Sequence, residues 1–216
     1  MAGTIIVDKV QLDVGQDTLT VLANTGSTIL TANTLGINAA SLGFGTLPSG
    51  RLPTIPRTNM PTGAVLQALS ATKTDTFTTT STSWVDITGL SVSITPTSAT
   101  SKILIFASLQ ISNGSTGQGT FFRFMRNSTA INIGDAIGSR SQVTNMSQEG
   151  SSSGRFITPM NSIFLDSPAT TSATTYKLQT NCLDVGTICI NRSGGNTDAS
   201  TYATSVSSIT VMEIAA

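Results

Sequence analysis

Hydrophobic and polar residues alternate in short runs from about Pro61 to the end of the chain. Short alternating runs separated by turn residues predict antiparallel strands, the pattern of a β-sandwich or barrel. The expected strands cover residues 65–70, 74–80, 84–87, 90–95, 102–112, 120–126, 130–133, 161–166, 175–182, 187–191 and 207–215. The polar segment 137–154 is expected to be a binding loop or an arm between subunits. The sequence therefore predicts an all-β knob domain over residues 61–216.

Two of these runs show which side chains should be buried. In KILIFASLQIS the odd-numbered positions of 103–111 share one face, while Leu104 and Phe106 lie on the other. Because both faces of its first half are apolar, this should be a central strand whose outer face contacts another subunit. In TFFRFMR, Phe122 and Phe124 alternate with an arginine, and the burial of each should contribute about 2 to 3 kcal/mol.

The first 20 residues form a separate segment, with an apolar run followed by alternating apolar positions. This pattern predicts one or two short strands. A strand pair of this size is marginal in water, so it should pair with another chain or pack on a neighbouring protein. The expected docking residues are Ile5, Ile6, Val7, Val10 and Leu12. The alternative is that the segment is the first edge strand of the sandwich.

Residues 21–60 predict an extended shaft and neck. Single apolar residues recur every five to seven positions or so among Gly and small polar residues, without a helical stripe. One such chain has nothing to bury these side chains against, whereas three chains wound about an axis do. The expected shaft contacts are Leu22, Ile29, Leu35, Leu42, Phe44, Leu47 and Leu52, followed by a stiff proline-rich neck, Gly45–Arg57. A flexible linker is the weaker alternative.

Composition narrows the range of partners. Charged residues make up 10% of the chain with a net charge of +0, so no basic surface is expected to recruit nucleic acid or anionic lipid. No apolar run is long enough to insert into a membrane. The N-terminus lacks signal-peptide features, so folding in the cytosol with reduced Cys182 and Cys189 is expected. The alternative is a disulfide across a hairpin centred on Val185–Gly186.

Candidate catalytic chemistry is sparse. The chain has no His, which removes His-based triads and imidazole metal sites, and no cofactor or metal site is expected. A carboxylate pair of the glycosidase kind remains open. No calcium-loop spacing links the acidic residues expected in loops or at strand ends, which are Asp135, Glu149, Asp166, Asp184 and Asp198. Trp84 and Tyr202 could stack on sugars, although Trp84 in its alternating run is expected in the core.

The knob resembles a known group of proteins over most of residues 61–216. The runs that carry the resemblance are PTGAVLQALSATKTDTFTTTSTSWVDITGLSVSITPTSATSKILI, FRFMRNSTAINIGDAIGSR, FLDSPATTSATTYKLQ, TICINRS and SSITVMEIAA. They resemble the C-terminal domain of fibre-like structural proteins from tailed phages of marine and cyanobacterial hosts. The segment GTLPSGRLP is similar to shaft-to-knob segments of phage tail fibres, and MAGTIIVDKVQLD resembles the start of small phage structural proteins.

The resemblance implies a virion component with a jelly-roll knob, somewhat like the trimeric tumour-necrosis-factor and complement C1q heads, and a threefold assembly. The resulting prediction is a non-enzymatic, homotrimeric tail-associated fibre. Its N-terminus would bind other virion proteins, and its knob would adsorb to a host surface glycan or protein, with unknown receptor-binding residues. The rivals are a capsid head fibre or decoration protein, a polysaccharide-degrading spike and a secreted cytokine-like ligand.

Overall fold

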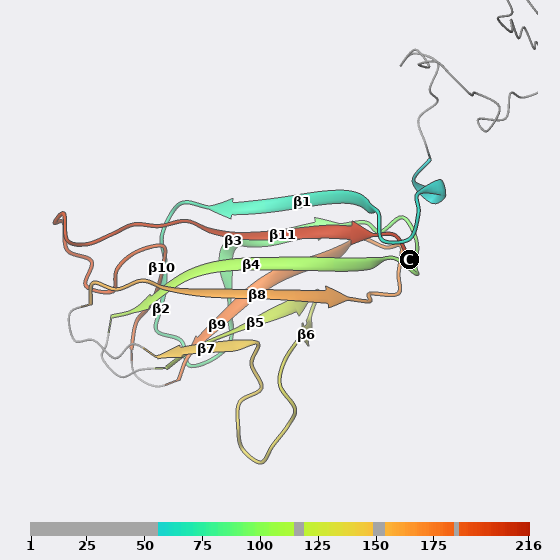
Figure 1. The fold of residues 1–216 in the computed structure, drawn as a ribbon. Helices are drawn as coiled ribbons and strands as arrows, with labels where there is room; N and C mark the ends of the chain where they lie inside the picture. The colour runs from blue at the N-terminus through green and yellow to red at the C-terminus, as the bar shows by residue number, and fades with distance from the viewer. Residues whose placement is uncertain (1–55, 115–118, 149–153, 184–185) are drawn as a thin grey trace, which may run out of the picture. The chain divides into compact units, whose positions relative to one another are not determined.

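The computed structural model describes residues 56–114, 119–148, 154–183 and 186–216. The predicted docking and shaft residues lie outside this part of the chain. The described residues form two antiparallel sheets that face each other (Figure 1), preceded by one short 3-10 helix, η3 (Arg57–Asn59). No described helix is long and apolar enough to cross a membrane.

The first sheet has β4 at its centre. It comprises β1 (Val65–Lys73), β2 (Phe77–Thr79), β4 (Lys102–Asn113), β8 (Thr158–Asp166), β10 (Ile188–Ile190) and β11 (Ser207–Ile214). The strand order is β1-β11-β4-β10-β2, and β8 also pairs with β4. The prediction of a central strand is confirmed, because β4 pairs with β11 along one edge and with β8 along the other.

The second sheet is built around β9 and β5. It comprises β3 (Val85–Ile94), β5 (Gly119–Arg126), β6 (Thr129–Ile131), β7 (Asn145–Gln148) and β9 (Thr174–Cys182), in the order β3-β9-β5-β6 with β7 also paired to β5. The two curled sheets enclose one apolar core, so the predicted all-β, jelly-roll-like sandwich is confirmed for the described residues.

The core consists of the inward side chains of both sheets. The odd-numbered residues of 103–111 on β4 are all buried, as their alternation predicts. From the other sheet, Phe122 and Phe124 are fully buried, and their rings meet edge to face with centroids 5.6 Å apart. Edge-to-face aromatic pairs add stability beyond the burial of their area. The period-two alternation of the sequence therefore identifies the interior correctly.

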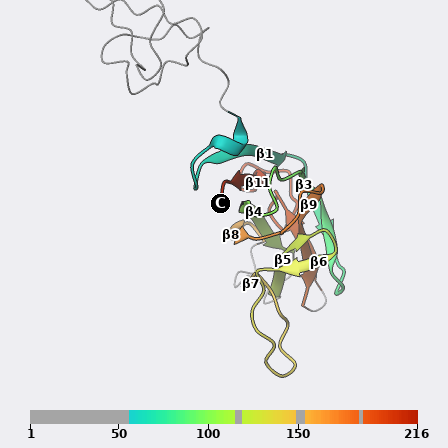
Figure 2. The same cartoon turned by 90° about the vertical axis from the view of Figure 1, so that its right-hand side faces the viewer.

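The structure differs from the sequence prediction in one pair of strands and in one loop. The segments 84–87 and 90–95 were expected as separate strands, but they form one strand, β3, whose register shifts between Asp86 and Ser91. Gly89 lies there with a φ of +87°, a conformation that favours glycine and lets the strand continue past an irregularity. The segment 137–154 is not entirely loop, because β7 pairs with β5 inside it. The remainder of the β6–β7 connection projects from the sandwich (Figures 1 and 2).

The alternative prediction of a hairpin that brings Cys182 and Cys189 together is also wrong. Cys182 ends β9 in the second sheet, whereas Cys189 belongs to β10 in the first sheet, so the strands that carry them do not pair. Both cysteines are free and buried. The chain crosses between sheets where a tight turn was expected, because β10 pairs with β4 and β2 in the first sheet.

A polar cluster joins the two sheets at one end of the core. Asp166 lies at the end of β8. Its two carboxylate oxygens accept hydrogen bonds from Arg126 Nη1, at 2.9 and 3.0 Å, and one of them also accepts from the hydroxyl of Tyr176 at 2.6 Å. Burial raises the pKa of the Tyr176 phenol well above its usual range, and the hydrogen bond to Asp166 raises it further. These bonds satisfy a carboxylate that is almost completely buried.

Candidate interaction surface

The outer face of the first sheet carries a row of apolar side chains. Ala68 on β1 pairs with Met212 on β11, Met212 pairs with Leu104 on β4, and Leu104 pairs with Leu165 on β8. Residues paired directly across strands project from the same face of a sheet. The four strands therefore present a continuous apolar row to the outside.

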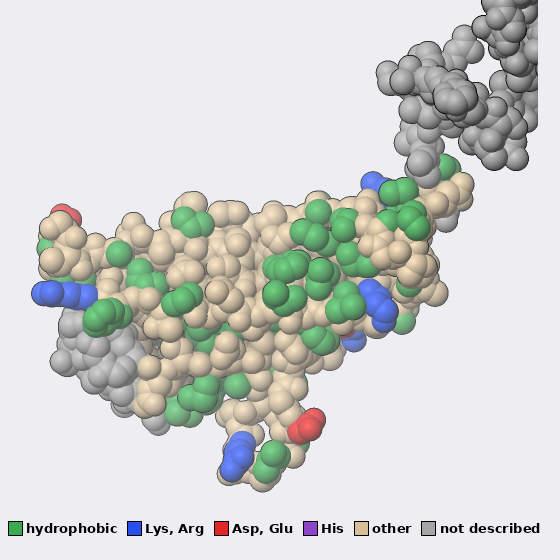
Figure 3. Space-filling model, viewed as in Figure 1, with side chains coloured by type: hydrophobic (Ala, Val, Ile, Leu, Met, Phe, Trp, Pro, Cys, Tyr) green, Lys and Arg blue, Asp and Glu red, His purple; other side chains and the backbone are tan. Residues whose placement is uncertain are grey.

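A second pairing extends this row. Phe106 on β4 lies opposite Ile163 on β8, two residues along each strand from the first row and on the same face. Ile163 is 64% exposed and Leu165 is 48% exposed, although both are large and apolar. We call these side chains the apolar face; they are Ala68, Leu104, Phe106, Ile163, Leu165 and Met212. Figure 3 shows hydrophobic side chains gathered over these strands.

Charges lie at the rim of the apolar face rather than within it. Lys102, at the start of β4, donates from Nζ to the hydroxyl of Ser167 at 3.0 Å, beyond the end of β8. Towards the other end of β4, the outward positions turn polar at Ser108 and Gln110. An apolar area with a polar rim is typical of a protein–protein contact surface.

The outer face of the second sheet has the opposite character. Gln179 on β9 receives two hydrogen bonds from Arg123, at 3.0 and 2.8 Å, and donates to Asp86 at 2.7 Å. Lys177 forms an ion pair with the same carboxylate at 2.7 Å. Burial alone would raise the pKa of Asp86, but hydrogen bonds from Lys177 and Gln179 outweigh it and lower that pKa. This ladder of internally paired polar groups is suited to solvent.

Trp84 belongs to this polar face and not to the core, contrary to the prediction. Val85 lies opposite buried Thr180 and points inward, so the preceding residue points outward. The guanidinium carbon of Arg123 lies 4.1 Å from the centroid of the Trp84 ring. The indole is thus half-buried beneath an arginine, which already occupies one of its faces.

The expected sites are distributed unevenly. The docking and shaft residues, together with Glu149 and Asp184, lie outside the described residues. Asp135 is exposed on the β6–β7 connection, and Asp166 is occupied by the cross-sheet cluster. Within the described ranges, no group of three or more acidic or Cys side chains is placed to hold a metal ion. Leu104 and Phe106 were expected to contact another subunit, and this stays a prediction. Strand pairing places Ile163, Leu165 and Met212 beside them on the same face.

Comparisons with known proteins find solved structures that are similar to this chain at low sequence identity. No protein-family model matches the chain, and no curated protein matches it. Among solved structures, it is similar to that of the infectious bursal disease virus Gt strain, with 14% identity and a TM-score of 0.36, covering 76% of this chain and 47% of that one. T=1 particles derived from infectious bursal virus give 10% identity, a TM-score of 0.36 and coverage of 78% and 45%. This chain spans less than half the length of those chains, and a similarity of this degree carries no functional conclusion.

Proposed function

We propose that the chain is a non-enzymatic structural component of a tailed-phage virion, a homotrimeric fibre whose sandwich domain is presented for adsorption to a host surface. The observation that carries this proposal is the apolar face, which leaves Ile163 64% exposed in a single chain. Three copies packed about a common axis would bury this face. The recurring apolar residues of the predicted shaft and the resemblance to phage fibre proteins support the same assembly.

The energetics favour a covered face. Complete burial of an aliphatic or aromatic side chain contributes about 1.5 to 3 kcal/mol relative to exposure. For Ile163, which has about two thirds of its surface exposed, roughly 1 to 2 kcal/mol per copy is still to be gained. Its neighbours Leu165 and Phe106 add to this gain, so a trimer in which three faces meet has a substantial driving force.

The first test is the mass of the full-length protein by size exclusion with light scattering. We expect three times the 22.3 kDa of one chain. Ile163→Asp should shift the protein to single chains, because it would place three carboxylates in a desolvated contact. Val206→Asp is the matched control, since Val206 is 50% exposed just before β11 and lies outside the apolar face. A stable single chain for the parent protein, or a trimer that survives Ile163→Asp, would refute the role of this face.

A capsid head fibre or decoration protein is the second candidate, because copies that associate through the apolar face could equally stand on a capsid shell. Both candidates predict a trimer, so their location on the virion separates them. Electron microscopy of virions labelled at the C-terminus of this chain should place the label on the tail. Label on the shell would support the decoration role. Cleavage of a host polysaccharide by the purified protein would instead support the spike hypothesis.

A further inference from the structure

A surface loop separates β10 and β11, the two strands that pair with the same edge of β4. Ile111 on β4 pairs with both β8 and β10, so these two strands lie on opposite edges of β4. Strand β11 is likewise on the edge opposite β8, and therefore β10 and β11 follow one another along the same edge. The chain leaves this edge after Asn191 and returns at Ser205, whose amide donates to Asn191 O at 3.0 Å. We call the intervening residues 192–204 the edge loop.

The edge loop is fixed by buried polar contacts at its base. The side-chain amide of Asn191, with no exposed surface, donates to Lys73 O at 2.7 Å and to Asp75 O at 3.0 Å. Ser193 is 1% exposed; its hydroxyl donates to Arg155 O at 2.8 Å and accepts from the amide of Ala203 at 3.0 Å. Since buried bonds of this kind restrain both ends, the loop presents its side chains on a rigid base.

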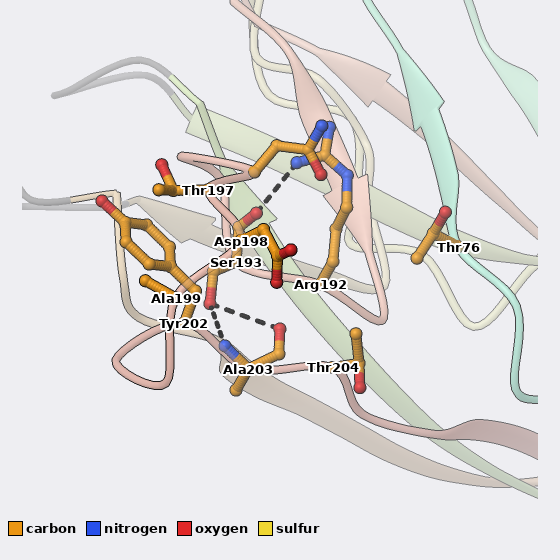
Figure 4. A pocket seen from close by; sticks show the side chains of 10 residues that line it. Thr76, Arg192, Ser193, Thr197, Asp198, Ala199, Tyr202, Ala203 and Thr204 are labelled. Carbon is orange, nitrogen blue, oxygen red and sulfur yellow. Dashed lines mark hydrogen bonds between the residues drawn. The ribbon is translucent and has the colours of Figure 1, made fainter.

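A cavity of about 250 Å³ opens between the edge loop and Thr76 of the β1–β2 connection (Figure 4). Tyr202 forms part of its lining and packs so closely on Gly195 that a Cβ there would lie 2.6 Å from Cε1 of the ring. The guanidinium carbon of Arg155 lies 5.8 Å from the ring centroid. The ring therefore packs against the loop backbone with an arginine nearby, while part of it lines the cavity.

Two charged side chains also line the cavity. Arg192 Nη1 donates to Ser193 O at 2.9 Å, which orients the guanidinium and leaves its other nitrogens available to a ligand. The carboxylate of Asp198 makes no hydrogen bond to any described residue. In Figure 4 it is seen between Arg192 and Tyr202. The cavity thus combines a fixed donor group, an acceptor group without a partner in the described chain, and an aromatic wall.

We propose that this cavity binds one pyranose unit of a neutral host-surface polysaccharide. Neighbouring sugar hydroxyls both donate and accept, so one pair can donate to Asp198 while accepting from Arg192. The ring of Tyr202 offers an apolar surface to the C–H groups of the sugar. An anionic ligand is disfavoured by the Asp198 carboxylate, and the lining has no large aliphatic side chain to bind an apolar ligand.

The position of the cavity suits this role. The described chain joins the sandwich where Gly63 donates to Ala215 O, beside the end of β11, whereas the edge loop precedes the start of β11. The cavity therefore lies at the opposite end of the first sheet from residues 57–64, where the described chain enters the sandwich (Figure 1). This inference rests on the proposed adsorption function and names the binding site and ligand class for it.

The test is saturation-transfer NMR on the full-length protein, with the methyl glycosides of glucose, galactose, mannose and N-acetylglucosamine as probes. At least one should bind in the millimolar range. An excess of the same glycoside should compete for the site. Asp198→Asn should weaken that binding about tenfold, the effect expected for loss of a charged hydrogen-bond acceptor. Asp135→Asn, which removes another exposed carboxylate, should leave it unchanged.

The outcomes separate this inference from the proposed function. Absence of transfer to all four glycosides at 50 mM overturns the inference, because this concentration is about fivefold above even a 10 mM dissociation constant. Transfer that Asp198→Asn leaves unchanged also overturns it. Preferential binding of inorganic phosphate also overturns it. A trimer by light scattering in the same samples leaves the assembly proposal standing in each of these cases. A single chain that still binds a glycoside through Asp198 overturns the trimer but not the site.

Discussion

Glu213 offers the sharpest test of how the first sheet is stabilised. Its side chain has no exposed surface, and no cation is paired with it among the described residues. Instead the carboxylate accepts from Gln67 Nε2 at 2.6 Å, from the amide of Thr97 at 2.6 Å and from the hydroxyl of Thr97 at 2.7 Å. These bonds join β1, β11 and the β3–β4 connection. Glu213→Gln replaces one acceptor oxygen with a donor, which then faces a donor.

The expected magnitude follows from these bonds. A hydrogen bond to a charged group contributes about 1.5 to 3 kcal/mol, so losing one or two of the three should cost about 2 to 4 kcal/mol at pH 7. Burial alone would raise the pKa of the Glu213 carboxyl, but hydrogen bonds from Thr97, Gln67 and Ser101 outweigh it and lower that pKa. A lowered pKa adds stability above the unfolded-state pKa, and this stability is lost as the pH falls through the folded-state pKa.

Urea unfolding of parent and variant, followed by the fluorescence of Trp84 at equal chain concentration, checks both points. The difference in free energy should be largest at pH 7 and should shrink below roughly pH 4.5, where glutamate in the unfolded chain becomes protonated. Asp135→Asn, at an exposed carboxylate, should show no such difference. A variant as stable as the parent at pH 7, or a difference that stays constant down to pH 3, would refute the reasoning.

Three further substitutions test other contacts. Asp166→Ala removes an ion pair and leaves the Tyr176 hydroxyl buried without its acceptor, so urea unfolding should show a loss of about 3 to 5 kcal/mol, against about 1 to 2 for Tyr176→Phe; equal losses would contradict this account. Phe124→Asp should yield no folded protein by circular dichroism, because it buries a charge in the core. Gly194→Ala would drive a Cβ into the carbonyl oxygen of Asn113; it should cost about 1 to 3 kcal/mol and abolish glycoside binding.

Strand alternation made much of the sandwich predictable from the sequence. The β4 run places apolar residues at every odd position and adds Leu104 and Phe106 on the other face, so both its central place and its outward apolar side chains follow from local pattern. The partners of those outward residues do not follow from it. Ile163 and Met212 reach the same face only through the pairing of β4 with β8 and β11, strands that are distant in sequence.

The errors have a common physical origin. Trp84 starts an alternating run, but which of the two alternating sets faces the core is decided by the partner strand, and β9 opposes Val85 with buried Thr180. The cysteine segment looked like a hairpin because a glycine lies between two short runs, yet the second run forms β10, between β4 and β2 in the other sheet. The cavity was missed because the sequence shows residues 192–204 only as a connection between the predicted strands 187–191 and 207–215. Its only local signals were the adjacent glycines and Asn191.

The apolar face and the cavity lie towards opposite ends of one sheet, which has a consequence for assembly. Leu104 and Ile111 on β4 are seven residues apart, so the row at Leu104 and the loop beside Ile111 are separated by about 23 Å along the strand. A contact that buries the row therefore need not cover the cavity. Three cavities would then face outward together on one trimer, and weak binding of one sugar unit at each would become strong attachment to a repeating polysaccharide. Under the two proposals, assembly would use the strand faces around Leu104 and recognition would use the edge loop, so each should be open to disruption without the other.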